Sequence, residues 1–449
     1  MKKFLVIVIA LVLALGSFGL AYAATPAPGG PFSTAFYIQN LAAVDETCSY
    51  TFYNATGGVA YASTTFTVSA NANYEIYTPS ISGLASGSYS GVITCDQPSE
   101  AIVNFSDTDS AGSHNGISAP ATTWYIPNLY NNYYTFYSNV YAQNTTGAPV
   151  NITLEIYGPD PSNPANSIMV YTDTKTNVPA SASVVFDQVG LSQLVANKPY
   201  SGKITATGNV APIVNYYGGP GSIQLYTYNP FVSGATKAYV PALYSNYYGY
   251  NTEMRVQNVG AGTATVTITY SNGQTTNTTI QQNSGQSFYT PNILPAGKTL
   301  YSAIVTSNQP IVVVVNESNA GNQAATYNGL LAGSTTVNVP AVMKNYYGYN
   351  TDVTCMNMGT VNTDVTITYK ILGVVSTYQT TKTGIAAGQL VNFYTPTDAA
   401  LASASTTNKK ISAVVTSTGA QPISCIVNES HSTNLGDVLY SYNAFPTVP

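Results

Sequence analysis

The sequence predicts an all-β protein in which four tandem antiparallel β-sandwich domains follow a signal peptide. Three observations predict this class. A set of short motifs recurs along the chain, apolar and polar side chains alternate with a period of two residues, and no segment after the N-terminal apolar run carries a sustained helical period. The 449 residues are enough for three or four domains.

Residues 1–23 have the features of a secretory signal peptide. Lys2 and Lys3 precede an apolar run from Phe4 to Leu15, and small residues end at Ala23, after which we expect cleavage. A membrane anchor is the alternative, but the run is short for a bilayer span, and no later stretch is long and apolar enough to cross a membrane. We therefore expect an extracellular or cell-surface protein without a membrane span in its mature chain.

The heptapeptide NYYGYNT occurs at 246–252 and again at 345–351, and a diverged copy lies at 132–136. These copies belong to four repeats that follow a Pro/Gly linker. We place the linker at 24–31, repeat 1 at 32–118, repeat 2 at 119–234, repeat 3 at 235–334 and repeat 4 at 335–449. The landmark tyrosines of the motif are Tyr133, Tyr134, Tyr247, Tyr248, Tyr346 and Tyr347.

Three further motifs recur in the same order. A Gln-Asn pair occurs at 39–40, 143–144 and 257–258, and its asparagine alone at 357. A Tyr-Ser-Gly or Tyr-Ser-Ala motif occurs at 89–91, 200–202 and 301–303, and a Val-Asn pair at 103–104, 214–215, 315–316 and 427–428. Self-similarity at a fixed interval indicates that the same structural unit is built four times.

The alternation of side chains predicts what each unit is made of. In the segment 265–270 three apolar side chains share one face of a strand and three threonines share the other, and the segments 150–156 and 365–369 repeat this pattern. Asn272-Gly273 follows the first of these strands and predicts a two-residue hairpin turn, because both turn positions need positive φ. About seven short strands in each repeat is the pattern of an immunoglobulin-like sandwich.

The tyrosine motif lies near the start of its repeat. Because Tyr247 and Tyr248 are adjacent in sequence, we expect one to face the core and the other to face outward. Gly249 predicts a bend or bulge. We favour a structural landmark, and the outward tyrosine leaves a surface recognition site open.

The four cysteines predict two disulfides and no free thiol. Cys48 and Cys95 lie in repeat 1, and Cys355 and Cys425 lie in repeat 4, which favours one bridge within each terminal repeat in an oxidising compartment. Each bridge is expected to join an early strand to the last strand of its repeat and to stabilise the fold by about 4 kcal/mol. We expect the terminal repeats to be the bridged ones because each has only one neighbour. A metal site is the alternative, but no C-x-x-C pair and no nearby histidine supports it.

Composition argues against catalysis and nucleic-acid binding. Only 7% of residues are charged and the net charge is −5, whereas phosphate contact needs clustered Lys and Arg. His114 and His431 are expected outside strands, and no Ser or Cys has the context of a nucleophile. We predict no catalytic residue, no cofactor and no metal, although Asp107–Gly112 partly matches the start of a calcium loop. Sequons, among them those at Asn316 and Asn428, leave glycosylation open.

From Phe32 to its C-terminus the chain resembles the tandem immunoglobulin-like repeats of bacterial extracellular surface, sheath, filament and adhesin proteins. The resemblance lies in the repetition and the strand pattern, and it implies a structural or adhesive role. We expect a non-catalytic structural protein of the cell exterior that associates with itself as a surface-layer, sheath or filament subunit. The alternative is an adhesin or carbohydrate-binding array in which exposed tyrosines stack on surface sugars.

The two ends of the chain suggest how it associates. Repeats 2, 3 and 4 open with a Val-Pro or Ile-Pro segment, here named the leading strand, which repeat 1 lacks. Residues 442–445 repeat the junction at 228–231, so the chain stops where a fifth leading strand would begin. We expect an uncovered sheet edge in repeat 1 and head-to-tail strand addition between molecules, which would give a filament. The alternative is a flexible tether at 24–31 and a frayed C-terminus.

Overall fold

The computed structural model of the chain describes residues 30–163, 166–219, 221–320, 322–402, 404, 406, 409–431 and 436–447, together with the backbone of residues 9–12. Most of the predicted signal peptide and of the linker at 24–31 therefore lies outside the described residues. Within them the all-β class is confirmed. Every strand pairing is antiparallel, and helical structure is limited to three short 3-10 turns. No helix among the described residues has the length and apolar character needed to cross a membrane.

Repeat 1 is built from two sheets. Its strands are β2 (Ser33–Asn40), β3 (Glu46–Tyr53), β4 (Val59–Ala62), β5 (Phe66–Val68), β6 (Asn73–Tyr77), β7 (Ser90–Cys95), β8 (Ser99–Ser106) and β9 (Ala111–Asn115), with the 3-10 turn η1 (Thr78–Ser80) after β6. One sheet has the order β7-β3-β4, with β5 also paired to β3, and the other has the order β6-β2-β8-β9.

Repeat 4 has the same two-sheet plan. Its strands are β25 (Thr336–Val342), β26 (Lys344–Tyr346), β27 (Tyr349–Asn357), β28 (Thr363–Ile371), β29 (Thr377–Ile385), β30 (Leu390–Tyr394), β31 (Ile411–Ser417), β32 (Ile423–His431), β33 (Leu439–Asn443) and β34 (Phe445–Pro446), with η3 (Ala399–Leu401) after β30. One sheet has the order β29-β28-β31-β25-β34. The other has the order β26-β27-β32-β33, with β30 on β27.

Repeats 2 and 3 fuse two of these strands into one. Repeat 2 contains β10 (Ala121–Tyr133), β11 (Phe136–Asn144), β12 (Val150–Pro159), β13 (Ser167–Val178), β14 (Ser183–Asp187), β15 (Pro199–Tyr217) and β16 (Leu225–Tyr228). Repeat 3 contains β17 (Ala235–Leu243), β18 (Ser245–Tyr247), β19 (Tyr250–Asn258), β20 (Ala264–Tyr270), β21 (Thr275–Ile280), β22 (Gly285–Tyr289), η2 (Thr290–Asn292), β23 (Tyr301–Asn319) and β24 (Ala324–Asn328). The 19-residue strands β15 and β23 pair with one sheet in their first half and with the other in their second half.

The predicted alternation of side chains is confirmed in the strands that carry it. Val266, Ile268 and Tyr270 of β20 are buried, whereas the threonines between them are exposed or half-buried. In repeat 3 these side chains form one apolar cluster with Val256 of β19 and with Val313 in the second half of β23. Each strand thus buries one face in this cluster and leaves the other to solvent or to a neighbouring repeat.

The order of strands differs from the immunoglobulin order in several respects, of which the place of the first strand is one. There the first strand joins the sheet that contains the second and the fifth strands. Here the leading strands β10, β17 and β25 instead pair with β15, β23 and β31, beside the third strand of the repeat. In repeat 1 the place of the leading strand along β7 is taken by β1 (Ile9–Val12), which belongs to the predicted signal peptide. Cleavage after Ala23 would remove β1 and leave that side of β7 unpaired.

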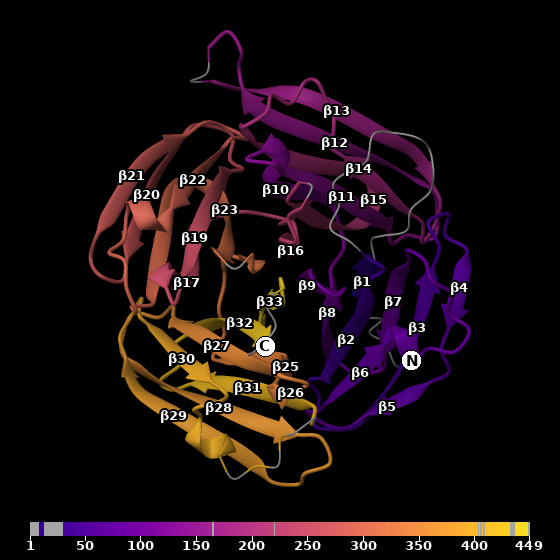
Figure 1. Cartoon of the computed structure of the whole chain (residues 1–449), viewed down its shortest axis with the longest axis vertical. Coiled ribbons are helices and arrows are strands. Elements are labelled where there is room, and N and C mark those ends of the chain that lie inside the picture. The colour runs from indigo at the N-terminus through magenta and orange to yellow at the C-terminus, as the bar shows by residue number, and fades with distance from the viewer. Residues whose placement is uncertain are drawn as a thin grey trace.

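The four repeats surround a common centre and close on themselves (Figure 1). One strand near the end of each repeat, namely β9, β16, β24 or β33, lies at this centre, and each contacts the next, β33 of repeat 4 meeting β9 of repeat 1. We call these the central strands, and the four contact regions between neighbouring repeats the seams. The expectation that repeats 1 and 4 have only one neighbour each is therefore wrong, because they pack against each other.

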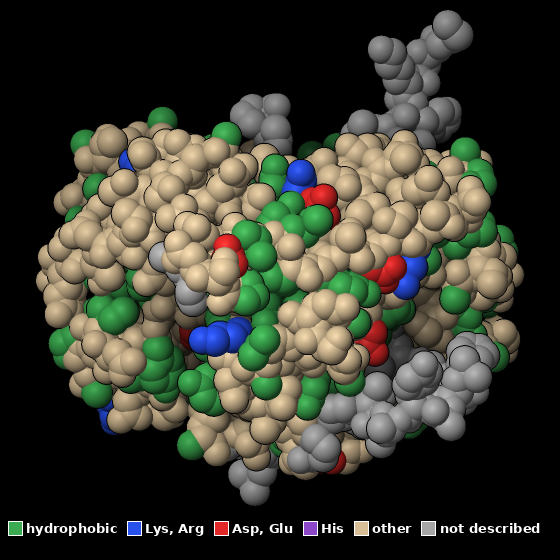
Figure 2. Space-filling model, turned by 90° about the horizontal axis from the view of Figure 1, so that it is seen from above, with side chains coloured by type: hydrophobic (Ala, Val, Ile, Leu, Met, Phe, Trp, Pro, Cys, Tyr) green, Lys and Arg blue, Asp and Glu red, His purple; other side chains and the backbone are tan. Residues whose placement is uncertain are grey.

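The surface carries little charge. In Figure 2 uncharged side chains cover most of the visible face, and lysines and acidic residues are scattered singly or in small groups. Several of the charged side chains lie instead in the seams. The solitary arginine of the sequence, Arg255, is 2% exposed, and Glu317 and Glu429 are fully buried.

Candidate functional site at the seams

A ring of four asparagines closes the centre of the molecule at one end of the central strands. Asn115, Asn229, Asn328 and Asn443 occupy equivalent positions at or just after the ends of β9, β16, β24 and β33. The Nδ2 of Asn115 donates to the carbonyl oxygen of Asn443 (2.6 Å), and that of Asn443 donates to Asn328 (2.7 Å). Asn328 donates to Asn229 (2.7 Å), and Asn229 donates back to Asn115 (2.9 Å). A cycle of this kind closes only when four equivalent repeats surround one axis.

Each side chain in this asparagine ring makes hydrogen bonds to the backbone of a neighbouring repeat, as a paired strand would. Besides the bonds from Nδ2, the Oδ1 of Asn229 accepts the backbone N–H of Asn115 (2.9 Å). In the same way Asn443 accepts from Asn328 (2.9 Å), and Asn115 accepts from Asn443 (3.1 Å). An amide side chain carries both a donor and an acceptor, so it can satisfy both backbone groups of the next residue around the axis. Leu or Ser at these positions could not do this.

One buried aspartate, through its carboxyl and its backbone N–H, joins all four repeats at the opposite end of the central strands. Asp437 of repeat 4 accepts the backbone N–H of Leu225 in repeat 2 (2.8 Å) and that of Ala324 in repeat 3 (2.7 Å). Its own N–H donates to the carbonyl oxygen of Asp109 in repeat 1 (2.6 Å). Burial raises the pKa of Asp437, while the backbone N–H donors oppose that rise.

The Val-Asn motif makes a second set of contacts at three of the four seams. Its asparagine receives or gives a hydrogen bond across the seam to the residue that follows the same motif in the preceding repeat. Asn428 of repeat 4 donates to Glu317 of repeat 3 (2.8 Å), and Asn104 of repeat 1 donates to Glu429 of repeat 4 (2.8 Å). Between repeats 2 and 3, the hydroxyl of Tyr216 is hydrogen-bonded to Asn316. The sequons at 316 and 428 are thus buried parts of a seam.

Glu317 and Glu429 lie where a charge is costly. Burial raises the pKa of each carboxyl to about 8, against the opposing effect of the asparagine that donates to it. The second carboxyl oxygen of both residues is buried without a hydrogen-bond partner. A proton on that oxygen removes the charge, so near neutral pH both groups favour the neutral acid.

The two residues of the Gln-Asn motif bond to different parts of the molecule. In repeats 3 and 1 the glutamine reaches the preceding repeat, since Gln257 donates to the carbonyl oxygen of Gly202 (3.2 Å) and Gln39 donates to that of Ala413 (3.4 Å). In repeat 2, Gln143 donates within its own repeat, to the carbonyl oxygen of Ser181 (3.5 Å). The asparagine instead fixes a loop of its own repeat. In repeat 3, Asn258 donates to the carbonyl oxygens of Gly262 (2.7 Å) and Ile280 (2.9 Å).

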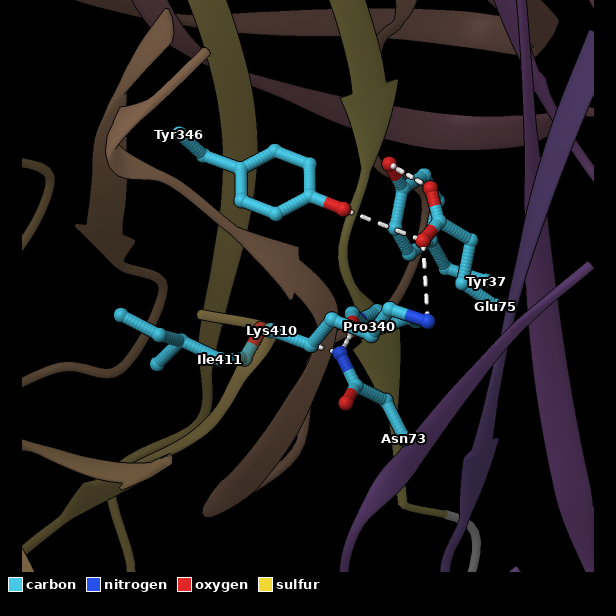
Figure 3. Close-up of polar contacts among 7 residues, drawn as sticks. All are labelled: Tyr37, Asn73, Glu75, Pro340, Tyr346, Lys410 and Ile411. Atoms are coloured by element: carbon cyan, nitrogen blue, oxygen red, sulfur yellow. Dashed lines mark hydrogen bonds and ion pairs between the residues drawn. The ribbon is translucent and has the colours of Figure 1, made fainter. Parts of the chain in front are cut away.

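The seam between repeats 4 and 1 has no covalent connection across it (Figure 3). Glu75 of repeat 1 accepts the hydroxyl of Tyr37 (2.9 Å) and, across the seam, that of Tyr346 (3.1 Å), and it forms an ion pair with Lys410 (3.0 Å). Asn73 of repeat 1 donates across the same seam to the carbonyl oxygens at 340 (2.7 Å) and 411 (3.1 Å). Tyr346, one of the landmark tyrosines, is therefore a seam residue.

The seam between repeats 2 and 3 holds the arginine. The Nε of Arg255 donates to the carbonyl oxygen of Pro127 in repeat 2 (2.6 Å), and its Nη1 donates to Ser287 of its own repeat (3.1 Å). Burial lowers the pKa of this guanidinium. The buried arginine was not singled out from the sequence, although a single arginine in so uncharged a chain was a signal that could have found it.

The disulfides are the two predicted pairs, but they lie elsewhere in the repeat than expected. Cys48 of β3 is bonded to Cys95 of β7, and Cys355 of β27 is bonded to Cys425 of β32. In both cases the cysteines are direct partners on neighbouring strands of one sheet, with Cα atoms 4.1 and 4.0 Å apart. Neither bridge reaches the last strand of its repeat, because further strands, β8 and β9 in repeat 1 and β33 and β34 in repeat 4, follow the bridged ones.

The tyrosine motif is a tight hairpin. Tyr248 and Gly249 have φ of +50° and +88° and connect β18 to β19, with Tyr247 paired to Tyr250 on the two sides of the turn. Two consecutive positive φ values are typical of a type I′ turn. The bulge lies not at Gly249 but at Asn246 (φ +54°), where the register shifts. Repeat 4 has the same turn at Tyr347-Gly348, and repeat 2 has it at Tyr134-Thr135.

Each landmark pair holds one inner and one outer tyrosine. Tyr133, Tyr247 and Tyr346 are half-buried, whereas Tyr134, Tyr248 and Tyr347 are exposed. The inner ring of repeat 3, Tyr247, stacks on Tyr244 at 5.4 Å between ring centres.

The two histidines lie within strands, contrary to expectation. His114 is part of β9 and His431 ends β32. Burial lowers the pKa of His114 to about 4. In the segment that partly matches a calcium loop, Asp107 accepts the backbone N–H groups of Asp109 (2.8 Å), Ser110 (2.7 Å) and Gly30 (2.6 Å).

Comparison with known proteins gives no family. No protein-family model matches the chain, and no curated protein matches it. Among solved structures, Thermotoga maritima 1070 matches at 21% identity over 21% of this chain and 93% of that chain (TM-score 0.18), and the Anabaena sensory rhodopsin transducer matches at 23% identity over 18% and 92% (TM-score 0.15). A tetra-tandem repeat in the extending region of a large adhesion protein matches at 13% identity over 91% and 93% (TM-score 0.12). With TM-scores this low, we draw neither fold nor function from them.

Proposed function

We propose that this chain is an exported, non-catalytic structural protein of the cell exterior that acts as one closed ring of four repeats. The observation that carries the proposal is the cyclic set of hydrogen bonds among Asn115, Asn229, Asn328 and Asn443. Several of the sequence motifs that recur in this chain contribute residues that join neighbouring repeats. Repetition that serves mutual packing is typical of a scaffold.

The closed ring changes how self-association is proposed to occur. The central strand β33 of repeat 4 contacts β9 of the same chain, so that head-to-tail contact is made within one molecule. Assembly into a surface layer, sheath or filament would then use the two faces or the outer edge of the ring. The bounds 32–118, 119–234, 235–334 and 335–449 for immunoglobulin-like domains remain part of this proposal, as does the adhesive alternative that uses exposed tyrosines.

Export and assembly are tested together on the full-length chain expressed with its N-terminus. We expect the protein outside the cytoplasm, with an N-terminal sequence that begins at Ala24, and ring-shaped single particles or ordered arrays of them in electron micrographs. Protein retained in the cytoplasm with an intact N-terminus would contradict export. Extended strings of four separate beads would contradict the closed ring.

A further inference from the structure

Three exposed tyrosines occupy backbone conformations that their residue type disfavours. Tyr134, Tyr248 and Tyr347 are 71%, 66% and 69% exposed and have φ of +47°, +50° and +47°. A side chain with a Cβ costs roughly 1–2 kcal/mol in this left-handed region, and type I′ turns normally place Asn, Asp or Gly there. An exposed ring contributes little to the core. Its recurrence in three repeats therefore points to a role outside the fold.

The three rings lie at one end of the central strands. In each hairpin the residue just after the turn contacts the beginning of the central strand of its own repeat. Phe136 lies 5.6 Å from Tyr226 between ring centres, Tyr250 is hydrogen-bonded to Gln323, and Tyr349 lies 5.6 Å from Tyr440. This is the end marked by Asp437, opposite the asparagine ring. The exposed tyrosines thus surround the axis on one face of the molecule, here named the tyrosine face.

The chemistry beside each ring is polar and mostly uncharged. An exposed asparagine stands two residues before each exposed tyrosine, at Asn132, Asn246 and Asn345. Glycine or threonine follows the tyrosine, and each exposed ring packs edge-to-face against the half-buried tyrosine before it, with ring centres 4.8 to 4.9 Å apart. Lys298 is the exception, with its ammonium 5.0 Å from the centre of the Tyr248 ring. A ligand that stacks on Tyr248 would use the other side of the ring or displace this lysine.

We propose that the tyrosine face binds a neutral polysaccharide, with Tyr134, Tyr248 and Tyr347 as stacking platforms. The C–H face of a sugar ring packs on an aromatic ring, and an adjacent amide can both donate to and accept from sugar hydroxyls. A ligand that repeats along its length suits a face that repeats the same platform three times, because three weak contacts on one polymer add by avidity. A bilayer or a second copy of the chain would need a continuous apolar surface.

This inference deepens the adhesive side of the proposed function and rests on export of the chain. Its test uses the intact protein with chitin and amorphous cellulose in pull-down experiments and with soluble mannan in affinity electrophoresis. The triple variant Tyr134→Asn, Tyr248→Asn, Tyr347→Asn should lose about tenfold or more in binding and keep or raise its melting temperature, because Asn tolerates positive φ. Single variants should lose less.

A second set of exposed, repeated tyrosines supplies the matched control. Tyr77, Tyr289 and Tyr394 are 45%, 45% and 41% exposed, and none has positive φ. Their triple replacement by serine should leave binding within about twofold of the parent.

Four results would overturn the proposal. The first is that the parent binds none of the three polysaccharides, and the second is that both triple variants lose binding equally. The third is that the first triple variant mainly loses self-association in sedimentation. The fourth is that it mainly loses binding to liposomes. The last two would assign the face to a second copy or to a membrane. Cell fractionation reports on export independently, so failure of the ligand assignment is distinguishable from failure of the proposed function.

Discussion

The hydrogen bonds that each residue of the asparagine ring must make explain why asparagine occupies these positions. Each asparagine of the ring serves one backbone carbonyl with Nδ2, and at least three of the four also serve a backbone N–H with Oδ1. Aspartate has the same shape as asparagine but lacks the N–H donor. A substitution by aspartate therefore separates the contribution of the Nδ2 hydrogen bond from that of the Oδ1 hydrogen bond.

We predict that Asn229→Asp lowers the free energy of unfolding by about 1–3 kcal/mol, because one hydrogen bond is lost and a carboxylate oxygen faces the carbonyl oxygen of Asn115. Urea denaturation followed by tyrosine fluorescence measures the change. Asn272→Asp, in an exposed turn, is the matched control and should be nearly neutral. Equal stability of the two variants would mean that the ring contributes nothing.

The buried acids of the seams predict a pH dependence. The folded-state pKa of Glu317 and of Glu429 is about 8, above the ordinary value of 4.5, so the folded state holds protons that the unfolded state has released. Their contribution to stability is therefore greatest below pH 4.5 and falls as pH rises from about 4.5 to about 8. We predict that the protein melts at a lower temperature at pH 8.5 than at pH 6.5, a window above the titration of His114.

The double variant Glu317→Gln, Glu429→Gln should flatten this dependence, since a neutral amide keeps the acceptor for the neighbouring asparagine. We expect its advantage in stability over the parent to be larger at pH 8.5 than at pH 6.5 by about 1 kcal/mol or more. Differential scanning calorimetry at both pH values measures this. An unchanged slope in the double variant would assign the pH dependence to other groups.

At the scale of elements, periodicity predicted strands well and residue propensity predicted turns poorly. The alternating segment at 265–270 is a strand with the expected buried face. Asn272-Gly273 is not a two-residue turn, because only Gly273 has positive φ. The two-residue turn lies instead at Tyr248-Gly249, where the first residue disfavours it. A turn held in place by the strands around it can carry a residue that propensity would not choose.

The glycine of that turn gives a prediction for the element. Gly249 has φ +88° and no atom within 4 Å of an added Cβ, so a substitution there tests the backbone alone. We predict that Gly249→Ala lowers the free energy of unfolding by about 1–2 kcal/mol. Gly147→Ala, also with open space around it but without positive φ, should change stability by less than about 0.5 kcal/mol. A similar cost at both positions would remove the case for a strained turn.

At the scale of the whole molecule, the sequence predicted the repeats and the two cysteine pairs but not the ring. The recurrent Gln, Asn and Ser were visible in the sequence, and Gln257, Asn428 and Ser302 all bond to a neighbouring repeat. The sequence alone does not show whether a recurrent polar residue bonds within its own repeat or to the next repeat. Bonds of either kind recur with the same spacing along the chain. The missing leading strand of repeat 1 suggested an open end, whereas repeat 4 packs against repeat 1.

The seam between repeats 4 and 1 is where the ring should open first, because the other three seams are also joined by the chain itself. Glu75 lies at this seam between Tyr37, Tyr346 and Lys410, so Glu75→Lys places two ammonium groups together and removes the acceptor of both hydroxyls. A compact chain of this length has a radius of gyration of about 22 Å. We predict that small-angle scattering gives a value close to this for the parent and a clearly larger one for Glu75→Lys.

The repeats themselves should remain folded in the opened molecule, since each has its own apolar cluster apart from a few residues contributed by neighbours. Asp173→Lys is the control, because it removes a half-buried carboxyl of an ion pair on the edge strand β13, far from that seam. Asn73→Leu weakens the same seam without adding a charge, because it deletes both hydrogen bonds to the carbonyl oxygens of repeat 4. It should also increase the radius of gyration. If neither seam variant expands the particle while both lower the melting temperature, the four repeats unfold as one unit and do not hinge at this seam.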